Sequence, residues 1–114
     1  MERQLPQLNA VELSDDQALL NLLIQPELKY FNGHFSHFPI LPGVVQLDWA
    51  IHFAAQYFEH QFEFAGMELV KYQHPIMPET VLSLRLEWIR ERNKLHFTYF
   101  DNDKIYSKGK VKLR

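Results

Sequence analysis

The feature that most constrains the fold is an alternation of apolar and polar side chains, with a period of two, over the C-terminal part of the chain. Residues 80–89 follow this pattern, and residues 95–100 and 105–113 form two further segments with the character of strands. The short polar stretches RERNK and DNDK separate the three segments. Strands joined by turns this short predict an antiparallel meander with one dry and one wet face. The last strand is predicted to carry on its outer face Tyr106, Lys108, Lys110 and Lys112.

A single apolar helix is predicted ahead of this meander. Residues 44–60 contain no proline or glycine and are apolar on nearly every face, which is typical of a buried helix. Pro39 and Pro42 favour an extended approach, and Gly43 allows the chain to turn into the helix. The helix is therefore expected to begin directly after the Pro-Gly step.

Two further segments complete the predicted fold. Residues 67–74 are expected to form a strand, and residues 19–24 fit either a strand or the end of a helix that begins near Ser14. One buried helix before a one-sided antiparallel sheet predicts an α+β domain, in which the sheet wraps around one long buried central helix as in the hotdog fold. Because the sequence has no repeat and no linker, residues 1–114 are expected to form one such domain.

Composition limits the cellular setting and the available chemistry. The chain is 46% hydrophobic and 14% aromatic, as compact globular proteins are. It has no cysteine, which excludes a disulfide scaffold, a thiolate metal site and a cysteine nucleophile. The first residues lack the pattern of a secretion signal, and no apolar window of roughly 20 residues exists for a membrane span. These observations predict a cytoplasmic protein with no membrane partner.

Charge is distributed unevenly along the chain. Residues 1–70 hold two basic and nine acidic side chains, whereas residues 71–114 hold ten basic and five acidic ones. A basic part of this kind can attract an acidic partner, either nucleic acid or an acidic carrier protein. The alternative is that these charges simply form the solvated faces of strands. Nucleic acid is not the expected partner, because the sequence contains neither a recognition helix nor a stacking motif.

Asp48 is the side chain that fits the apolar helix least. An ionised carboxylate buried without partners is strongly unfavourable, so Asp48 must be hydrogen-bonded, be protonated or face a cavity. One interpretation is structural, with Asp48 stabilised by the helix dipole or bonded to His52 one turn away. The other is functional, with His34 as a base and the backbone N–H groups at the helix N-terminus as a site for an oxyanion. A base, an acid and such a site can together abstract a proton next to a carbonyl.

Residues 33–48, GHFSHFPILPGVVQLD, resemble the active-site segment of the FabA and FabZ family of 3-hydroxyacyl-[acyl carrier protein] dehydratases, whose pattern is approximately GHFPxxPxMPGxxxxE/D. Residues 67–80 are similar to the strand and turn that follow in that family. The version LPGVVQLDWAIH is most similar to the ApeI-like branch found with aryl-polyene gene clusters. The positions that match the first motif are Gly33, His34, Phe35, Pro39, Pro42, Gly43 and Asp48.

The resemblance implies dehydration of a 3-hydroxyacyl chain, carried on acyl carrier protein, to the trans-2-enoyl form in fatty acid or aryl-polyene type biosynthesis. It implies that His34 is the base, that Asp48 is the acid and that the Gly43 N–H holds the thioester oxygen. It also implies that no metal or cofactor is needed, and that two subunits share each active site in a homodimer or a heterodimer. Further substrate-binding positions that it implies are Phe35, Pro42 and His52.

The chain departs from the family pattern at Ser36 and His37, which replace Pro-Gly, and at His52, where the family usually has glutamine. Two other functions therefore stay open. One is a hotdog thioesterase, which releases a free thiol, and the other is a non-catalytic hotdog subunit that binds acyl chains or completes a heterodimer. A metal site built from the histidines is disfavoured, because their spacing matches no zinc pattern.

Overall fold

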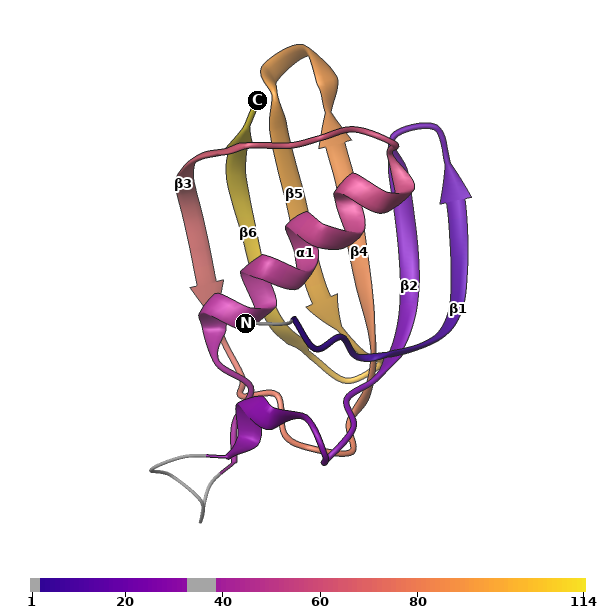
Figure 1. Cartoon of the computed structure of the whole chain (residues 1–114), viewed down its shortest axis with the longest axis vertical. Helices are drawn as coiled ribbons and strands as arrows, with labels where there is room; N and C mark the ends of the chain where they lie inside the picture. The colour runs from indigo at the N-terminus through magenta and orange to yellow at the C-terminus, as the bar shows by residue number, and fades with distance from the viewer. Residues whose placement is uncertain (1–2, 33–38) are drawn as a thin grey trace.

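A curved sheet of six antiparallel strands surrounds one helix in the computed structural model, which describes residues 3–32 and 39–114 (Figure 1). The α+β class predicted from the sequence, with an antiparallel sheet around one long helix, is confirmed. In chain order the elements are β1 (Gln7–Ser14), β2 (Gln17–Leu23), the 3-10 helix η1 (Lys29–Phe31), α1 (Gly43–Tyr57), β3 (Phe64–Tyr72), β4 (Val81–Ile89), the 3-10 helix η2 (Arg90–Arg92), β5 (Lys94–Phe100) and β6 (Ile105–Leu113).

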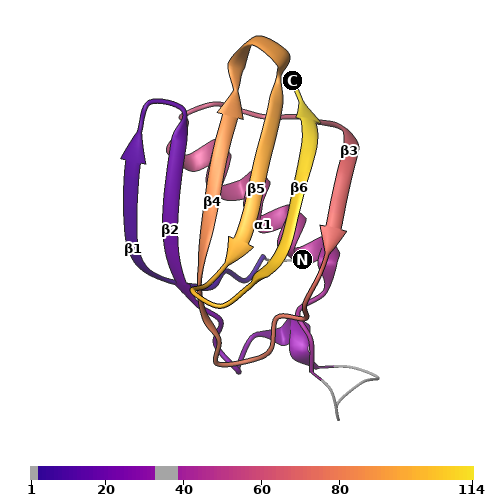
Figure 2. The same cartoon turned by 180° about the vertical axis from the view of Figure 1, so that it is seen from behind.

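The strands lie in the order β1-β2-β4-β5-β6-β3. The predicted meander of β4, β5 and β6 is confirmed, and it forms the centre of the sheet. The chain passes from β2 on one side of the meander, through η1 and α1, to β3 on the other side. Figure 2 shows that α1 covers one face of the sheet and leaves the opposite face open. As a result β1 and β3 are the two edges of the sheet.

The N-terminal hairpin differs from the sequence-based expectation. Residues 19–24 lie almost entirely in β2, so the strand interpretation is confirmed and a helix that begins near Ser14 is wrong. The sequence pattern indicated no strand before β2, yet β1 pairs with it across a tight turn at Asp15 and Asp16. All eight residues of β1 are exposed, so no buried face imposes the alternation that reveals a strand, and the β1–β2 pairing also shifts register between Leu8 and Ala10.

Tyr106 was predicted to lie on the outer face of β6, and this prediction is wrong. Its side chain is buried, and its hydroxyl donates a hydrogen bond to the carboxylate of Asp101. The β5–β6 pairing shifts register between Tyr99 and Phe100, so the period of two begins only after Tyr106 and Ser107, which are both buried. The lysines that follow are exposed as predicted: Lys108, Lys110 and Lys112.

Helix α1 begins at Gly43, directly after the Pro-Gly step, as predicted. It ends at Tyr57, three residues earlier than predicted, and Glu59 just beyond it has a left-handed backbone conformation. Its apolar composition indicated burial on nearly every face, but the structure buries one face and leaves Val44 exposed on the other. None of the helices in the described residues is long and apolar enough to cross a membrane.

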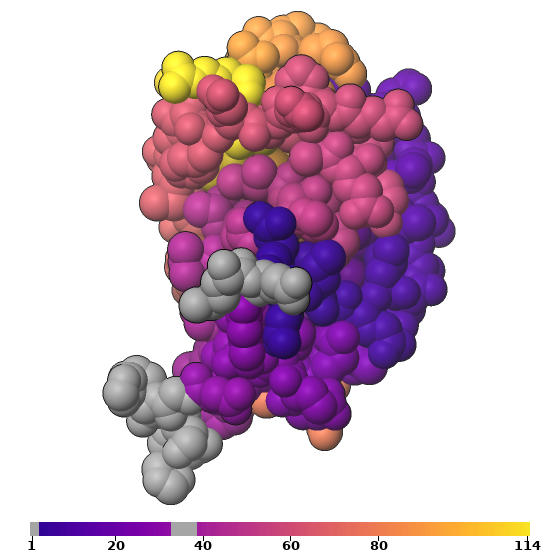
Figure 3. Space-filling view, in the orientation of Figure 1, coloured from indigo at the N-terminus to yellow at the C-terminus, as the bar shows by residue number. Residues whose placement is uncertain are grey.

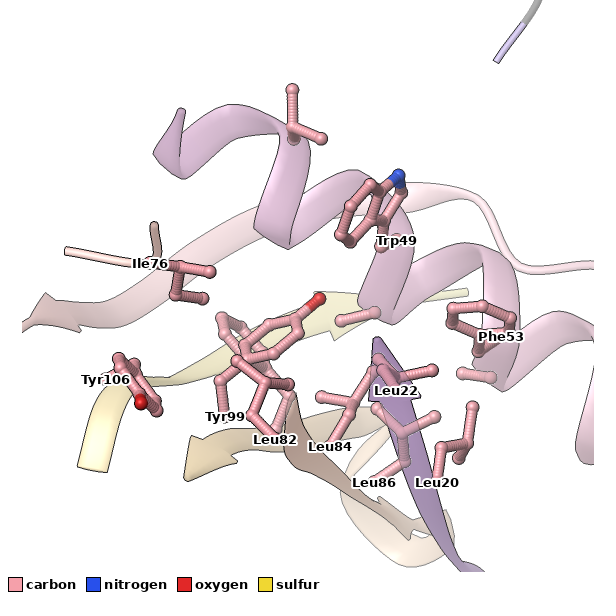
Figure 4. Close-up of a cluster of buried hydrophobic side chains, with 14 of the residues drawn as sticks. Leu20, Leu22, Trp49, Phe53, Ile76, Leu82, Leu84, Leu86, Tyr99 and Tyr106 are labelled. Atoms are coloured by element: carbon pink, nitrogen blue, oxygen red, sulfur yellow. The ribbon is translucent and has the colours of Figure 1, made fainter. Parts of the chain in front are cut away.

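The core lies between α1 and the concave face of the sheet. Figure 4 shows Trp49 and Phe53 of α1 facing the leucines that alternation places on the inner side of the strands. Each of these buried leucines contributes about 1.5–3 kcal/mol by leaving water, so this layer fixes the position of α1 on the sheet. The labelled leucines are Leu20 and Leu22 of β2 and Leu82, Leu84 and Leu86 of β4.

Candidate active site

The N-terminus of α1 is held against the segment that follows β3. The Leu41 backbone N–H donates a hydrogen bond to the Ile76 carbonyl at 2.9 Å, which fixes the chain just before the helix. Pro42 is the N-cap, and its carbonyl accepts the N–H groups of Val45 and Gln46. The first N–H groups of a helix have no partner within it, and together they favour negative charge. Gly43 supplies the first of these groups in α1.

Gly43 lies in close contact with the ring of Tyr72 at the end of β3. A β-carbon on Gly43 would lie 2.5 Å from Tyr72 Cζ and 2.7 Å from its hydroxyl oxygen. Glycine therefore avoids a clash with the end of this side chain, and no unusual backbone angle is involved. Partial burial raises the pKa of Tyr72, so its phenol stays protonated and can donate a hydrogen bond at neutral pH.

An open pocket of about 360 Å³ lies beside this contact. Its walls are residues 40–43, Gln46 and residues 72–75, so it joins the N-terminus of α1 to the end of β3. Predicted site residues Pro42 and Gly43 both line it. The pocket can therefore bring a ligand's polar atom to the first backbone N–H groups of the helix.

A buried polar network fixes the first turn of α1 on the sheet. Gln46 is buried, and its side-chain amide donates to the Leu41 carbonyl at 3.1 Å. The Ser107 hydroxyl donates to Gln46 Oε1 at 2.6 Å, and the Tyr99 hydroxyl donates to the Gln46 backbone carbonyl at 2.7 Å. Sequence reasoning missed these residues, although an amide inside the apolar run VVQLD was a signal that a polar partner lies opposite.

Asp48 lies on the outer face of α1, where it forms an ion pair with Arg3. Arg3 Nε donates to Asp48 Oδ2 at 2.7 Å and Nη2 donates to Oδ1 at 3.1 Å, with side chains 43% and 46% exposed. Asp48 is thus half-exposed in the single chain instead of buried as expected. The proposed bond to His52 is replaced by this pair, and Arg3 Nη1 also lies 3.3 Å from His52 Nδ1.

The contacts of the Arg3 guanidinium shift the pKa values of two side chains in this cluster, Arg3 and His52. The hydrogen bond to Asp48 raises the pKa of Arg3. Burial lowers the pKa of His52, and the positive charge of Arg3 lowers it further against the opposing effect of Asp48. His52 is accordingly a neutral imidazole at neutral pH. Sequence reasoning missed Arg3, and no local pattern marks a residue that pairs across 45 positions.

Residues 3–6, which we call the strap, lie across the outer face of α1 (Figures 1 and 3). The Gln4 backbone carbonyl accepts the indole N–H of Trp49 at 2.8 Å. The Gln4 backbone N–H donates to the Tyr30 hydroxyl at 3.1 Å. The Gln4 side chain accepts the backbone N–H of Lys29 at 2.6 Å. The strap is therefore fixed to α1 and η1 at one residue, which places Arg3 beside Asp48.

The predicted site residues fall into three groups. Pro42 and Gly43 line the pocket, whereas Asp48 and His52 lie on the outer face of α1 and are not part of its walls. His34 and Phe35 lie outside the described residues. The structure therefore does not bring Asp48 to the pocket within one chain. Residues 3–32 and 39–114 contain no group of three side chains that could hold a metal ion.

The architecture defines the class of protein. An antiparallel sheet wrapped around one helix is the hotdog fold, and a thioesterase from Haemophilus influenzae shares it with a TM-score of 0.54. That thioesterase is only 14% identical, with 90% of this chain and 73% of the thioesterase covered, so the likeness shows the fold alone.

Two of the similar solved structures combine almost complete coverage of the chain with TM-scores of at least 0.86. One is the dehydratase heterocomplex ApeI:P from Xenorhabdus doucetiae, at 36% identity and a TM-score of 0.90, with 96% of this chain and 98% of that chain covered. The other is an uncharacterized protein from Erwinia carotovora subsp. atroseptica, at 38% identity and a TM-score of 0.86, with 97% of each chain covered. The hotdog fold predicted from the sequence is thus confirmed.

The family follows from the sequence comparison. The family model for ApeI-like proteins, described as ApeI dehydratase, matches residues 10–110, and the chain belongs to this family. A 3-hydroxyacyl-[acyl-carrier-protein] dehydratase FabZ from Streptococcus uberis is 33% identical, and the match covers 75% of this chain. The chain spans 66% of the length of that relative. The resemblance inferred from the motif at residues 33–48, including its ApeI-like branch, is confirmed.

Proposed function

We propose that this chain is a dehydratase that converts 3-hydroxyacyl chains on acyl carrier protein into trans-2-enoyl chains, in cytoplasmic fatty acid or aryl-polyene type biosynthesis. Membership of the ApeI-like family supports the proposal. The observation that carries it is the pocket that reaches Gly43 at the N-terminus of α1. A thioester oxygen placed there accepts a hydrogen bond from the Gly43 N–H while negative charge develops on it.

In the proposed reaction, the His34 imidazole removes a proton from C2 of the substrate. The electron pair of that C–H bond forms the double bond between C2 and C3. The C3–O bond breaks with its electrons on oxygen, and Asp48 donates the proton that completes a water molecule. His34 then releases its proton and Asp48 regains one, which returns the site to its starting state. The reaction is redox-neutral and consumes no co-reactant.

The proposal places the two halves of each site on different subunits. Asp48 follows Gly43 by five positions, and at about 3.6 residues per turn the two point to different sides of α1. Pairing with a second subunit is supported by the unpaired edge of β3, which exposes apolar side chains that include Met67 and Leu69. A homodimer is the proposed form, and a heterodimer with a related hotdog subunit is the alternative.

Acyl carrier protein is the proposed carrier of the substrate, and a row of lysines supports this part of the proposal. The row lies on the open face of the sheet, where Lys71 of β3 is directly opposite Lys108 of β6. Like charges in such a pair repel, and an anionic partner relieves the repulsion. Lys71 precedes Tyr72, which lines the pocket, so the Lys71 end of the row shares this stretch of β3 with the pocket but lies on the opposite face of the sheet. The complete row is Lys71, Lys108, Lys110 and Lys112.

The three candidate functions differ in the products they release. Purified protein is incubated with a 3-hydroxyacyl thioester, and both free thiol and absorbance of the enoyl thioester are followed. Formation of the enoyl product without free thiol supports the dehydratase. Release of free thiol supports the thioesterase, and binding of the acyl chain with neither product supports a non-catalytic subunit; either of these results rejects the proposal.

A further inference from the structure

Arg3 contacts both polar side chains on the outer face of α1. Its guanidinium bonds to the two oxygens of Asp48 through two different nitrogens, and its third nitrogen lies beside His52 Nδ1. A planar fork that engages both oxygens fixes the orientation of a carboxylate, which a single ammonium group does not do. The position of the Asp48 side chain is therefore set by a residue 45 positions away in the sequence.

The backbone that carries Arg3 is held in place independently of this ion pair. Gln4 forms hydrogen bonds with Trp49, Tyr30 and Lys29, and none of them involves Arg3. Pairing with Asp48 therefore costs only the rotamer freedom of the Arg3 side chain, since the main chain beside it is already ordered. This arrangement distinguishes the pair from an ion pair that forms by chance between two mobile surface side chains.

We propose that Arg3 is a positioning residue for Asp48: it orients the protonated carboxyl group through one oxygen, and once Asp48 has given its proton to the leaving hydroxyl it holds both oxygens of the carboxylate, which is the arrangement in this structure. The proposal rests on the proposed dehydratase function. A cation fixed beside a carboxyl group before the reaction stabilises the carboxylate as it forms, without further reorganisation. Arg3 touches no substrate atom in this role and acts through Asp48 alone. The strap thereby becomes part of the site.

A second arginine provides a matched control for the ion pair itself. Arg90 binds Asp16 through two nitrogens, with Nη2 to Oδ1 at 2.7 Å and Nε to Oδ2 at 3.3 Å. The side chains of this pair are 69% and 34% exposed, and Arg90 lies in η2 beside the β1–β2 turn. Exposed pairs of this kind contribute little to stability. Loss of either arginine should therefore leave the protein folded, while only Arg3 affects Asp48.

The kinetic test compares Arg3→Gln, Arg3→Lys and Arg90→Gln on a 3-hydroxyacyl thioester. We expect Arg3→Gln to lower kcat by about tenfold or more with little change in KM, because the loss falls on the step in which charge develops. Arg3→Lys should recover part of the rate, and millimolar guanidinium should partly restore Arg3→Gln without affecting Arg90→Gln. Wild-type kcat in Arg3→Gln, or a loss that guanidinium does not change, overturns the proposal.

A second measurement tests the contact without any turnover. The charged groups that face His52 are Arg3 from the strap and Asp48 from its own helix. Arg3→Gln removes one of the influences that lower the pKa of His52, so NMR titration of this imidazole should give a higher pKa than in the wild type or in Arg90→Gln. An unchanged pKa of His52 would show that Arg3 does not contact the site, and it would overturn the proposal. An inactive wild-type protein with the expected shift instead rejects the dehydratase function and retains the contact.

Discussion

The ring of Tyr72 occupies the space in which a side chain on Gly43 would lie. The end of β3 therefore packs, through this ring, directly against the backbone at the beginning of α1. The Tyr72 atoms Cζ, Oη and Cε1 lie 2.5, 2.7 and 2.8 Å from the β-carbon position of Gly43. Both residues of this contact line the pocket. The Pro-Gly step recognised in the sequence therefore has a packing role as well as a role at the helix N-terminus.

Gly43→Ala should displace the Tyr72 ring. Because Tyr72 is half-exposed, the ring can move into solvent, and we expect the free energy of unfolding to fall by only about 1 kcal/mol. Turnover should fall more strongly, since the pocket loses a wall. In a Tyr72→Ala background the added methyl group should have no further effect on stability. Equal losses of stability in both backgrounds, measured by urea unfolding, would contradict this account.

Ser107→Ala should destabilise the protein, because it leaves Gln46 Oε1 buried without its donor. An unsatisfied buried acceptor costs about 1–3 kcal/mol, which urea unfolding can measure. Ser83→Ala on the open face of β4 is the control, with an expected change within about 0.5 kcal/mol. Adding Gln46→Leu to Ser107→Ala should recover part of the loss. The network has no structural importance if the two serine variants are equally stable.

The two edges of the sheet should differ in their role. Met67 on β3 and Leu13 on β1 are both exposed apolar side chains, at 61% and 55%. We expect Met67→Glu to convert the proposed dimer into monomer, because a charge at the β3 edge opposes pairing with a second subunit. Leu13→Glu should leave the assembly intact. Light scattering measures the molar mass of each variant. If only Leu13→Glu dissociated the dimer, the interface would lie at the β1 edge and this prediction would be wrong.

The lysine row should affect carrier-bound substrates selectively. The double substitution Lys108→Glu and Lys110→Glu should raise KM for a thioester on acyl carrier protein by about tenfold, since an acidic partner is no longer attracted. Turnover of a small thioester analogue should stay close to that of the wild type. Arg90→Glu, beside the β1–β2 turn, makes the same type of charge change away from the row and should alter neither value. Parallel losses on both substrates would argue against docking at the row.

Local sequence patterns were sufficient to predict the elements that carry the site. The period of two located β4, β5 and β6, and the Pro-Gly step located the first residue of α1. These features depend on residues close together in the chain, so a single sequence reveals them. The motif at residues 33–48 added the family, because its glycine, prolines and acid stand at fixed spacing.

Other features depend on distant residues or on irregular pairing, and the sequence did not reveal them. Arg3 reaches Asp48 only because the fold brings the strap across α1. Tyr106 faces inward because a register shift precedes it, which a regular alternation cannot indicate. Asp48 was expected to be buried because its helix is apolar, but a single hotdog chain leaves the outer face of that helix partly exposed.

The most direct test of the central claim is mass spectrometry of acyl carrier protein loaded with 3-hydroxyacyl chains, before and after incubation with the wild type, His34→Ala and Asp48→Asn. Circular dichroism establishes that each variant is folded. We expect the wild type to convert the loaded carrier to a species lighter by one water molecule, and each variant to lose most of this rate. Turnover by His34→Ala at the wild-type rate, or no loss of water with any chain length, would contradict the assignment.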